Sequence, residues 1–228
     1  EEMILMKQTI QTKHLLNLNE TCAASLLEQF EYPWQALPHI SDFVISLGKT
    51  LSPDEYEQKE EHVWIARSAT VFPSAYITGP TIIGPNTEVR HCAFIRGKAI
   101  VGGGAVVGNS TELKNVILFN HVQVPHYNYV GDSILGYKAH MGAGSITSNV
   151  KSNKSLVEVN CDGEKIATGL KKFGAILGDH TEIGCNSVLN PGCVIGKGSQ
   201  IYPVSTVRGV VPEYHIYKQP NEIVAIKD

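Results

Sequence analysis

Aliphatic residues recur at every sixth position along most of the chain after residue 60. From Ile65 to Leu113 nine of them follow one another without a miss, and after short slips the spacing resumes and runs to Val207. This period matches neither the spacing of three and four in an amphipathic helix nor the alternation of an ordinary strand. It predicts short strands joined by tight corners, with three hexapeptides closing one triangular coil.

The residues between the aliphatic positions fit this geometry. Glycine directly follows several of them, as in Ile83-Gly84, Val101-Gly102 and Ile195-Gly196, where a corner needs close packing or a positive φ. The aliphatic side chains then point inward and stack on those of the next coil. About 21 hexapeptides make about seven coils, which at a strand spacing of roughly 4.8 Å stand on the order of 30 to 35 Å tall. We therefore predict an all-β fold, a parallel β-helix of hexapeptide repeats.

Two parts of the chain lack the repeat. The stretches NETCAASLLEQF and EYPWQALPHISDFVISL predict helices, and the acidic run DEYEQKEEH follows them. Within the repeat, residues 148–173 replace one corner with a loop in which a hairpin is expected at Cys161-Asp162-Gly163. The sequence thus predicts an N-terminal helical arm and linker, a β-helix with the inserted loop, and a C-terminal tail, over residues 1–60, 61–212 and 213–228 respectively.

Composition and charge narrow the class of protein. Only 18% of the 228 residues are charged, the formal net charge is -3, and no long apolar run occurs, so neither nucleic-acid binding nor membrane insertion is expected. The five cysteines are scattered and form no CxxC pair, which argues against a disulfide framework and a cysteine zinc site. The stretch EEMILMKQTIQTK lacks the features of an export signal. We expect a cytoplasmic protein.

Large polar side chains concentrate on three neighbouring coils. Arg96 and Lys114 each follow an inward aliphatic residue and are 18 residues, one full coil, apart, so they are expected to stack on one outward face. With no acidic partner in view, two stacked cations predict an anion site. The next coil brings Tyr129 to the same face, after a corner that starts at His126. This convergence favours a binding or catalytic site over solvated surface groups.

A resemblance to a known family becomes specific in this region. The segment GNSTELKNVILFNHVQVPHYNYVGDSILGYKAHMGAGSITSN resembles the acetyltransferase half of the bifunctional glucosamine-1-phosphate acetyltransferase/N-acetylglucosamine-1-phosphate uridyltransferase family. Its most specific parts are Glu112-Leu113-Lys114, His126 with Tyr129-Val130-Gly131-Asp132, and Gly142-Ala143-Gly144 leading to Asn149, and the similarity covers about residues 96–207. The resemblance implies left-handed winding, a homotrimer with active sites between neighbouring prisms, and acetyl-CoA as co-substrate. No glycine-rich loop like LAAGxGTRM occurs, so no uridyltransferase domain is expected in this chain.

The family's roles can be carried over residue by residue. They imply N-acetylation of an amino-sugar phosphate such as glucosamine 1-phosphate, within UDP-N-acetylglucosamine biosynthesis. His126 would be the general base, a task that suits histidine because it ordinarily titrates near neutral pH. The positions implied to bind the sugar phosphate are Arg96, Lys114, Tyr129, His140 and Lys172. The positions implied to contact CoA are Ala143, Asn149, Cys185, Pro203 and Lys218. No metal is expected.

Four positions depart from the family pattern. His140 replaces an asparagine that faces the amino sugar, and Val150 replaces a tyrosine. On the donor side Cys185 replaces a serine and Pro203 an alanine. The acceptor sugar and the acyl group are therefore left open. The inserted loop over residues 148–173 is expected to border or cover the groove for acetyl-CoA.

Two other functions fit parts of the sequence. Many hexapeptide prisms serve as non-catalytic trimerisation or regulatory modules attached to sugar nucleotidyltransferases, and the segment EYPWQAL is similar to the link that precedes such prisms. Trimeric zinc carbonic anhydrases share the fold and a His-x4-His spacing, which His121 and His126 have. Such a zinc needs a third histidine, and His91 is closer to His121 than that family's spacing requires.

Overall fold

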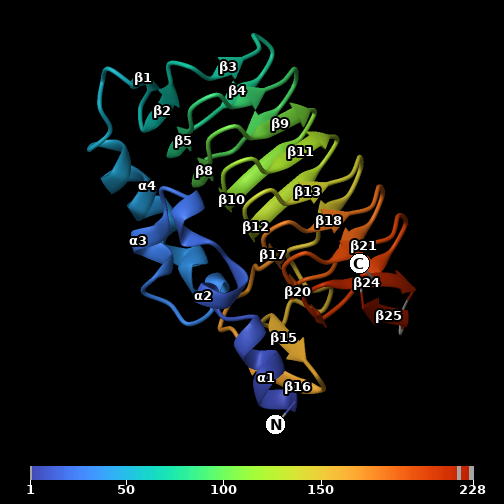
Figure 1. Cartoon of the computed structure of the whole chain (residues 1–228). Coiled ribbons are helices and arrows are strands. Elements are labelled where there is room, and N and C mark those ends of the chain that lie inside the picture. Colours follow the sequence, from blue (N-terminus) through green and yellow to red (C-terminus); the bar gives the residue numbers. More distant parts are fainter. Residues whose placement is uncertain (1, 220–221, 226–228) are drawn as a thin grey trace.

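The computed structural model describes residues 2–219 and 222–225. Its periodic part is a stack of short parallel rungs that wind into a triangular β-helix, with the N-terminal helices packed along one side (Figure 1). The predictions of an all-β, left-handed parallel β-helix and of an N-terminal helical arm are confirmed. Within the described residues no helix is long and apolar enough to cross a membrane.

The rungs form three faces, which we call face I, face II and face III in the order in which the chain visits them. Strands β10 (Glu112–Leu118) and β12 (Tyr129–Leu135) bend round a corner, so their first halves lie on face III and their second halves on face I. Face I also contains β2 (Val63–Ala66), β5 (Thr81–Ile83), β8 (Ala99–Val101), β17 (Ala175–Leu177), β20 (Cys193–Ile195) and β23 (Val210–Val211).

Face II and face III are built from similarly short strands. Face II contains β3 (Thr70–Val71), β6 (Glu88–Val89), β9 (Val106–Asn109), β11 (Gln123–His126), β13 (His140–Met141), β18 (Glu182–Ile183), β21 (Gln200–Ile201) and β24 (His215–Gln219). Face III is completed by β4 (Tyr76–Ile77), β7 (Phe94–Ile95), β14 (Ile146–Thr147), β19 (Val188–Leu189) and β22 (Thr206–Val207). With the first halves of β10 and β12, face III has seven described rungs, whereas face I and face II have eight each. The β-helix has about nine turns, which is more than the predicted number of about seven coils.

The sixth-position aliphatic residues form the core of the prism. Val89, Val107 and Val124 are aligned in three successive rungs of face II, and all are fully buried. Complete burial of each such side chain stabilises the fold by roughly 1.5–3 kcal/mol. Because every coil repeats this arrangement, outward side chains that follow equivalent aliphatic residues line up in columns, one residue per coil.

The arm lies against face I. It consists of α1 (Glu2–Thr9), α2 (Thr12–Leu15), η1 (Leu18–Glu20), α3 (Ala24–Leu27), η2 (Pro33–His39) and α4 (Ile40–Gly48). Helix α4 contacts β5, β8 and β10, and η2 contacts β12. The helices are shorter than the sequence pattern predicts, and η2 holds Pro33 and Pro38, which restrict regular α-helical hydrogen bonding. The acidic run that was expected to be a linker instead forms β1 (Tyr56–Glu60), antiparallel to β2.

The inserted loop also packs on face I. Its expected hairpin is confirmed as β15 (Glu158–Cys161) and β16 (Glu164–Ala167), with Asp162 and Gly163 in the left-handed region. Strand β15 contacts β20 and β23, and Lys7 of α1 forms an ion pair with Glu164. In its own chain the loop therefore lies beside the arm (Figure 1). The division of the chain at residues 60 and 212 remains a prediction, as does the place of the loop near a donor groove.

Candidate functional site

One corner column brings together the predicted base and most of the predicted CoA contacts. We call the corner between face II and face III the II–III corner. There the amide of Gly144 donates to the carbonyl of His126, that of Asn186 to Ala143, and that of Val204 to Cys185. The residues just before the turn in successive coils are therefore equivalent, and they are His91, Asn109, His126, Ala143, Cys185 and Pro203.

Lys218 lies beside this column, one position before it in the repeat. It follows Tyr217, which is paired with Ile201 in the neighbouring rung, so Lys218 lies opposite Tyr202 and next to the coil of Pro203. From His126 to Lys218 this edge of the prism crosses four coil spacings, which at roughly 4.8 Å each amount to about 19 Å. A single outward edge of the prism thus carries a histidine at one end and a lysine at the other.

The backbone around His126 is held firmly while its side chain faces outward. Its amide donates to Oδ1 of Asn128 over 3.1 Å, and Asn128, which is buried, uses its Nδ2 to bond the carbonyls of Gly142 and Ser145. Within the described residues the His126 imidazole makes no hydrogen bond or ion pair, and the residue is exposed. Both ring nitrogens are therefore accessible to a substrate.

A buried carboxylate organises the corner between face III and face I, which we call the III–I corner. Both carboxylate oxygens of Asp132 accept from Lys114 Nζ over 3.0 Å. Asp132 also accepts from Asn115 Nδ2 over 2.9 Å and from Asn149 Nδ2 over 2.6 Å. Its side chain is only 5% exposed. Asp132 belongs to a quoted family motif, but neither the repeat nor the resemblance predicted this role for it.

The expectation that the two stacked cations lack acidic partners is wrong. Arg96 Nη1 donates to Glu112 over 2.8 Å, and Lys114 is held by Asp132. Glu112 is two residues before Lys114 and therefore points to the same outward side of β10, where it meets Arg96 of the preceding coil. The hydrogen bond that Arg96 donates to Glu112 raises the pKa of Arg96. An incoming phosphate must compete with these carboxylates for the two cations. It can displace Glu112 from the solvent-exposed Arg96 more easily than it can displace the buried Asp132 from Lys114.

Three further predicted residues lie at or near the III–I corner. Tyr129 is half-buried, its hydroxyl accepts from Asn149 Nδ2 over 3.2 Å, and burial raises the pKa of the phenol, which keeps the hydroxyl protonated. Asn149, implied to contact CoA, thus points its side chain to Tyr129 and Asp132. Lys172 is exposed and precedes Phe173, whose amide donates to the carbonyl of Asn149. His126 and Tyr129 are three residue steps apart in the sequence, so their backbones are at most about 10 Å apart.

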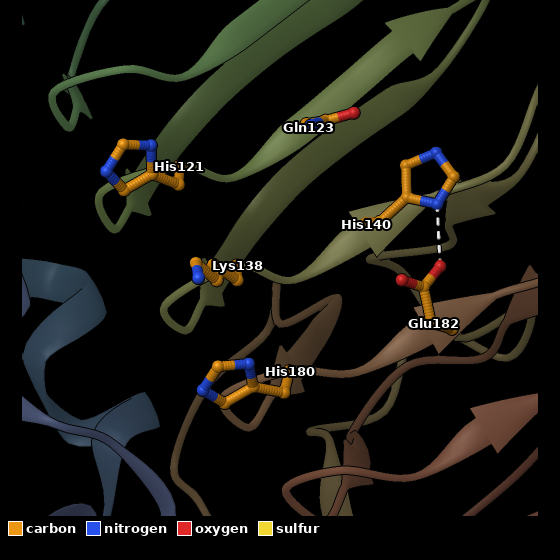
Figure 2. Close-up of a pocket in the computed structure, with 6 residues that line it drawn as sticks. All are labelled: His121, Gln123, Lys138, His140, His180 and Glu182. Atoms are coloured by element: carbon orange, nitrogen blue, oxygen red, sulfur yellow. Dashed lines mark hydrogen bonds and ion pairs between the residues drawn. The ribbon is translucent and has the colours of Figure 1, made fainter.

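His140 lies apart from both corners, in the middle of face II. Its Nδ1 is 2.7 Å from Oε2 of Glu182, in the strand that pairs with β13. The two side chains border a cavity of about 430 Å³, shown in Figure 2, which is lined by His121, Gln123, Lys138, His140, His180 and Glu182. We call it the face II cavity. No motif in the sequence pointed to it, and it brings together residues from three coils.

The geometry does not support the zinc alternative. His121 and His126 lie at opposite ends of face II, one before β11 and the other at its end, and His91 belongs to the II–III corner two coils earlier. Among residues 2–219 and 222–225, no group of three or more histidine, cysteine, aspartate or glutamate side chains is placed to hold a metal ion.

Comparison with known proteins gives a consistent result. The family model described as the GMPPB C-terminal domain matches residues 77–162. The chain is 33% identical over 124 residues to the bifunctional sugar-1-phosphate nucleotidylyltransferase/acetyltransferase of Sulfurisphaera tokodaii, covering 54% of this chain and 29% of that protein. It is 30% identical over 199 residues to the bifunctional protein GlmU of Methanococcus maripaludis, covering 86% of this chain and 48% of that protein. The chain therefore spans less than half the length of these relatives.

A search of solved structures also gave a match. A putative acetyltransferase from Bacillus cereus is 20% identical, with a TM-score of 0.41 over 74% of this chain and 80% of that one. The relatives above support the predicted resemblance to hexapeptide-repeat acyltransferases, in particular to the acetyltransferase domain of the bifunctional proteins.

Proposed function

We propose that this chain is an acetyl-CoA-dependent N-acetyltransferase that acts on an amino-sugar phosphate such as glucosamine 1-phosphate. The observation that carries the proposal is the II–III corner column, where the accessible imidazole of His126 stands at one end of an edge that runs through Ala143, Cys185 and Pro203 to Lys218. The name of the Sulfurisphaera tokodaii relative, which includes an acetyltransferase activity alongside nucleotidylyl transfer, supports the same assignment.

The reaction requires one proton acceptor close to the donor thioester. The sugar amine attacks the acetyl carbonyl, forming the C–N bond, while His126 takes a proton from the nitrogen. Collapse of the tetrahedral intermediate breaks the C–S bond, and the proton passes from His126 to the leaving thiolate, so that CoA is released as a thiol. General base catalysis by a positioned histidine contributes about 10²–10⁴-fold. The fixed backbone and outward ring of His126 suit this role.

We assign the donor to the II–III corner. The small side chains of Ala143 and Pro203 leave the edge open, and carbonyl and amide groups of the coils there can bond the amides of an extended pantetheine arm. Lys218 at the far end would attract the phosphates of CoA as a point charge. Two or more copies of the chain would give the groove its second wall, and we propose a homotrimer in a reducing compartment such as the cytoplasm, which accords with five free cysteines.

We assign the sugar phosphate to the III–I corner. Lys114, Tyr129, Lys172 and Arg96 provide cations and a protonated hydroxyl there. The backbone distance of at most about 10 Å between Tyr129 and His126 leaves room for a sugar ring between the phosphate and the reacting amine. Whether His140 contacts the acceptor depends on the neighbouring copy of the chain.

A non-catalytic β-helix related to sugar nucleotidyltransferases is the alternative. Its specific support is the pairing of Arg96 and Lys114 with carboxylates, which occupies the two cations predicted to hold a phosphate. Steady-state release of thiol from acetyl-CoA separates the two functions. We expect turnover with glucosamine 1-phosphate or another amino-sugar phosphate, and none with the matching sugar phosphate that lacks the amine. The absence of turnover with every amino sugar would leave the alternative.

Binding of acetyl-CoA should protect Cys185 from alkylation. Cys185 is exposed in the middle of the proposed donor edge, whereas Cys92 is exposed at the same corner four coils earlier and provides a matched control. At acetyl-CoA ten times above its Kd and without acceptor, brief treatment with iodoacetamide should label Cys185 about tenfold more slowly, with the rate at Cys92 unchanged. Mass spectrometry of the digested protein measures both rates. Equal labelling of Cys185 with and without acetyl-CoA would refute the donor assignment.

A further inference from the structure

A second column of polar side chains stands at the corner between face I and face II, which we call the I–II corner. His121, Lys138 and His180 occupy equivalent positions in three successive coils, with φ values of 59°, 58° and 58°. The amide of Lys138 donates to the carbonyl of Asn120 over 3.2 Å and that of His180 to Tyr137 over 2.8 Å. The three side chains therefore stand one above another along one wall of the face II cavity, as Figure 2 shows.

Aromatic packing holds this column in place. The ring of Tyr137 meets His121 edge-on at 5.8 Å between centroids and His180 edge-on at 5.3 Å. Lys138 Nζ lies 5.2 Å from the centroid of the same ring. One tyrosine thus positions two imidazoles and an ammonium group, so the entropic cost of fixing them for a ligand is reduced.

The nearby carboxylates are engaged elsewhere. Glu182 is bonded to His140 on the opposite side of the cavity (Figure 2). Asp179, next to His180, accepts the amides of Tyr137 and Asn17, each over 2.7 Å. In the described part of the chain Lys138 forms no ion pair with a carboxylate, in contrast to Arg96 and Lys114. The wall of the cavity therefore presents an ammonium group and two imidazoles, and Gln123 adds a side-chain amide.

We propose that the face II cavity binds a phosphorylated ligand, with His121, Lys138 and His180 as its phosphate contacts. Ammonium, imidazole and amide N–H groups are donors that phosphate oxygens accept readily. The column extends over two coil spacings, about 9–10 Å, and so suits a diphosphate better than a single phosphate. Gln123 and His126 are both exposed on β11, so a ligand anchored here extends toward His126. The direction of the ligand toward His126 rests on the proposed acetyl transfer, whereas the phosphate site itself does not.

Calorimetric titration of the full chain with pyrophosphate and with inorganic phosphate, in the absence of acetyl-CoA, tests the site. We expect pyrophosphate to bind more tightly than phosphate. Lys138→Asn should weaken pyrophosphate binding by about tenfold or more, because a charge-assisted contact is lost. Asparagine tolerates the left-handed backbone of this corner. Lys98→Asn is the matched control, since Lys98 is also an exposed corner lysine, with φ of 53°, outside the cavity.

The possible results separate this site from the proposed enzyme activity. Equal pyrophosphate affinities of the wild type and Lys138→Asn, or no binding by the wild type, would overturn the proposed site. An equal loss in Lys98→Asn would do the same, because it would point to a general charge effect. Thermal melting of both variants checks that they fold. Failure of acetyl transfer in a protein that still binds pyrophosphate through Lys138 would count against the proposed function alone.

Discussion

Replacing His126 with alanine is expected to lower the rate of acetyl transfer by about 10²–10⁴-fold, the usual contribution of a positioned general base. The imidazole makes no contact that the fold requires within the described residues, whereas its backbone is fixed by Asn128 and Gly144. The variant should therefore fold normally and bind acetyl-CoA as the wild type does. The loss should appear in kcat rather than in the KM for acetyl-CoA.

His91→Ala is the matched control for this experiment. His91 stands in the same II–III corner column as His126, two coils earlier, and is also exposed. Its ring packs against Phe72 at 4.4 Å, outside the proposed groove, so its removal should leave turnover within about twofold of the wild type. Thiol release and formation of the N-acetylated sugar should be measured together. If His126→Ala retains full activity, or if both variants lose it equally, His126 is not the base.

The periodic sequence predicted the fold well because one rule governs every coil. An aliphatic residue at each sixth position fixes which side chains are buried, and the same spacing aligns the outward residues of neighbouring coils. That alignment correctly anticipated that Lys114 stacks beside Arg96 in the parallel pairing of β10 with β7. It also makes the II–III corner column a direct consequence of the repeat, so that Ala143, Cys185 and Pro203 line up below His126.

The same rule could not predict contacts between residues at different phases of the repeat. Glu112 reaches Arg96 across coils, and Asp132 turns at a corner to reach Lys114 and Asn149. Neither contact follows from the spacing of six alone. The face II cavity is a similar case, because His121 and His180 belong to corners whereas His140 and Glu182 belong to strands. The arm and the inserted loop have no repeat at all, and their place on face I is set by tertiary packing, such as that of Trp34 on Phe173.

Gly108→Ala is expected to destabilise the protein by about 3 kcal/mol or more, through overpacking that the backbone cannot relieve. A Cβ at Gly108 would lie only 1.5 Å from the carbonyl oxygen of Pro125 in the next coil. Both groups belong to the backbone at the II–III corner, so one of the two rungs must shift. Pro125 has no amide N–H to donate to the ladder of hydrogen bonds. The two coils can approach closely at this point because glycine at position 108 has no Cβ.

The displacement of the rungs in Gly108→Ala should also change the proposed active site, because Pro125 directly precedes His126 and both residues belong to β11. We therefore expect the folded fraction of Gly108→Ala to show reduced acetyl transfer as well. Gly103→Ala is the control, since its Cβ would meet atoms of Pro85 at 3.3 Å, a contact that small movements relieve, and it should cost less than about 1 kcal/mol. Urea unfolding at one protein concentration compares the three proteins. A Gly108→Ala midpoint equal to that of the wild type would mean that the two coils at this corner lie farther apart than described, and the position assigned to His126 would then be wrong too.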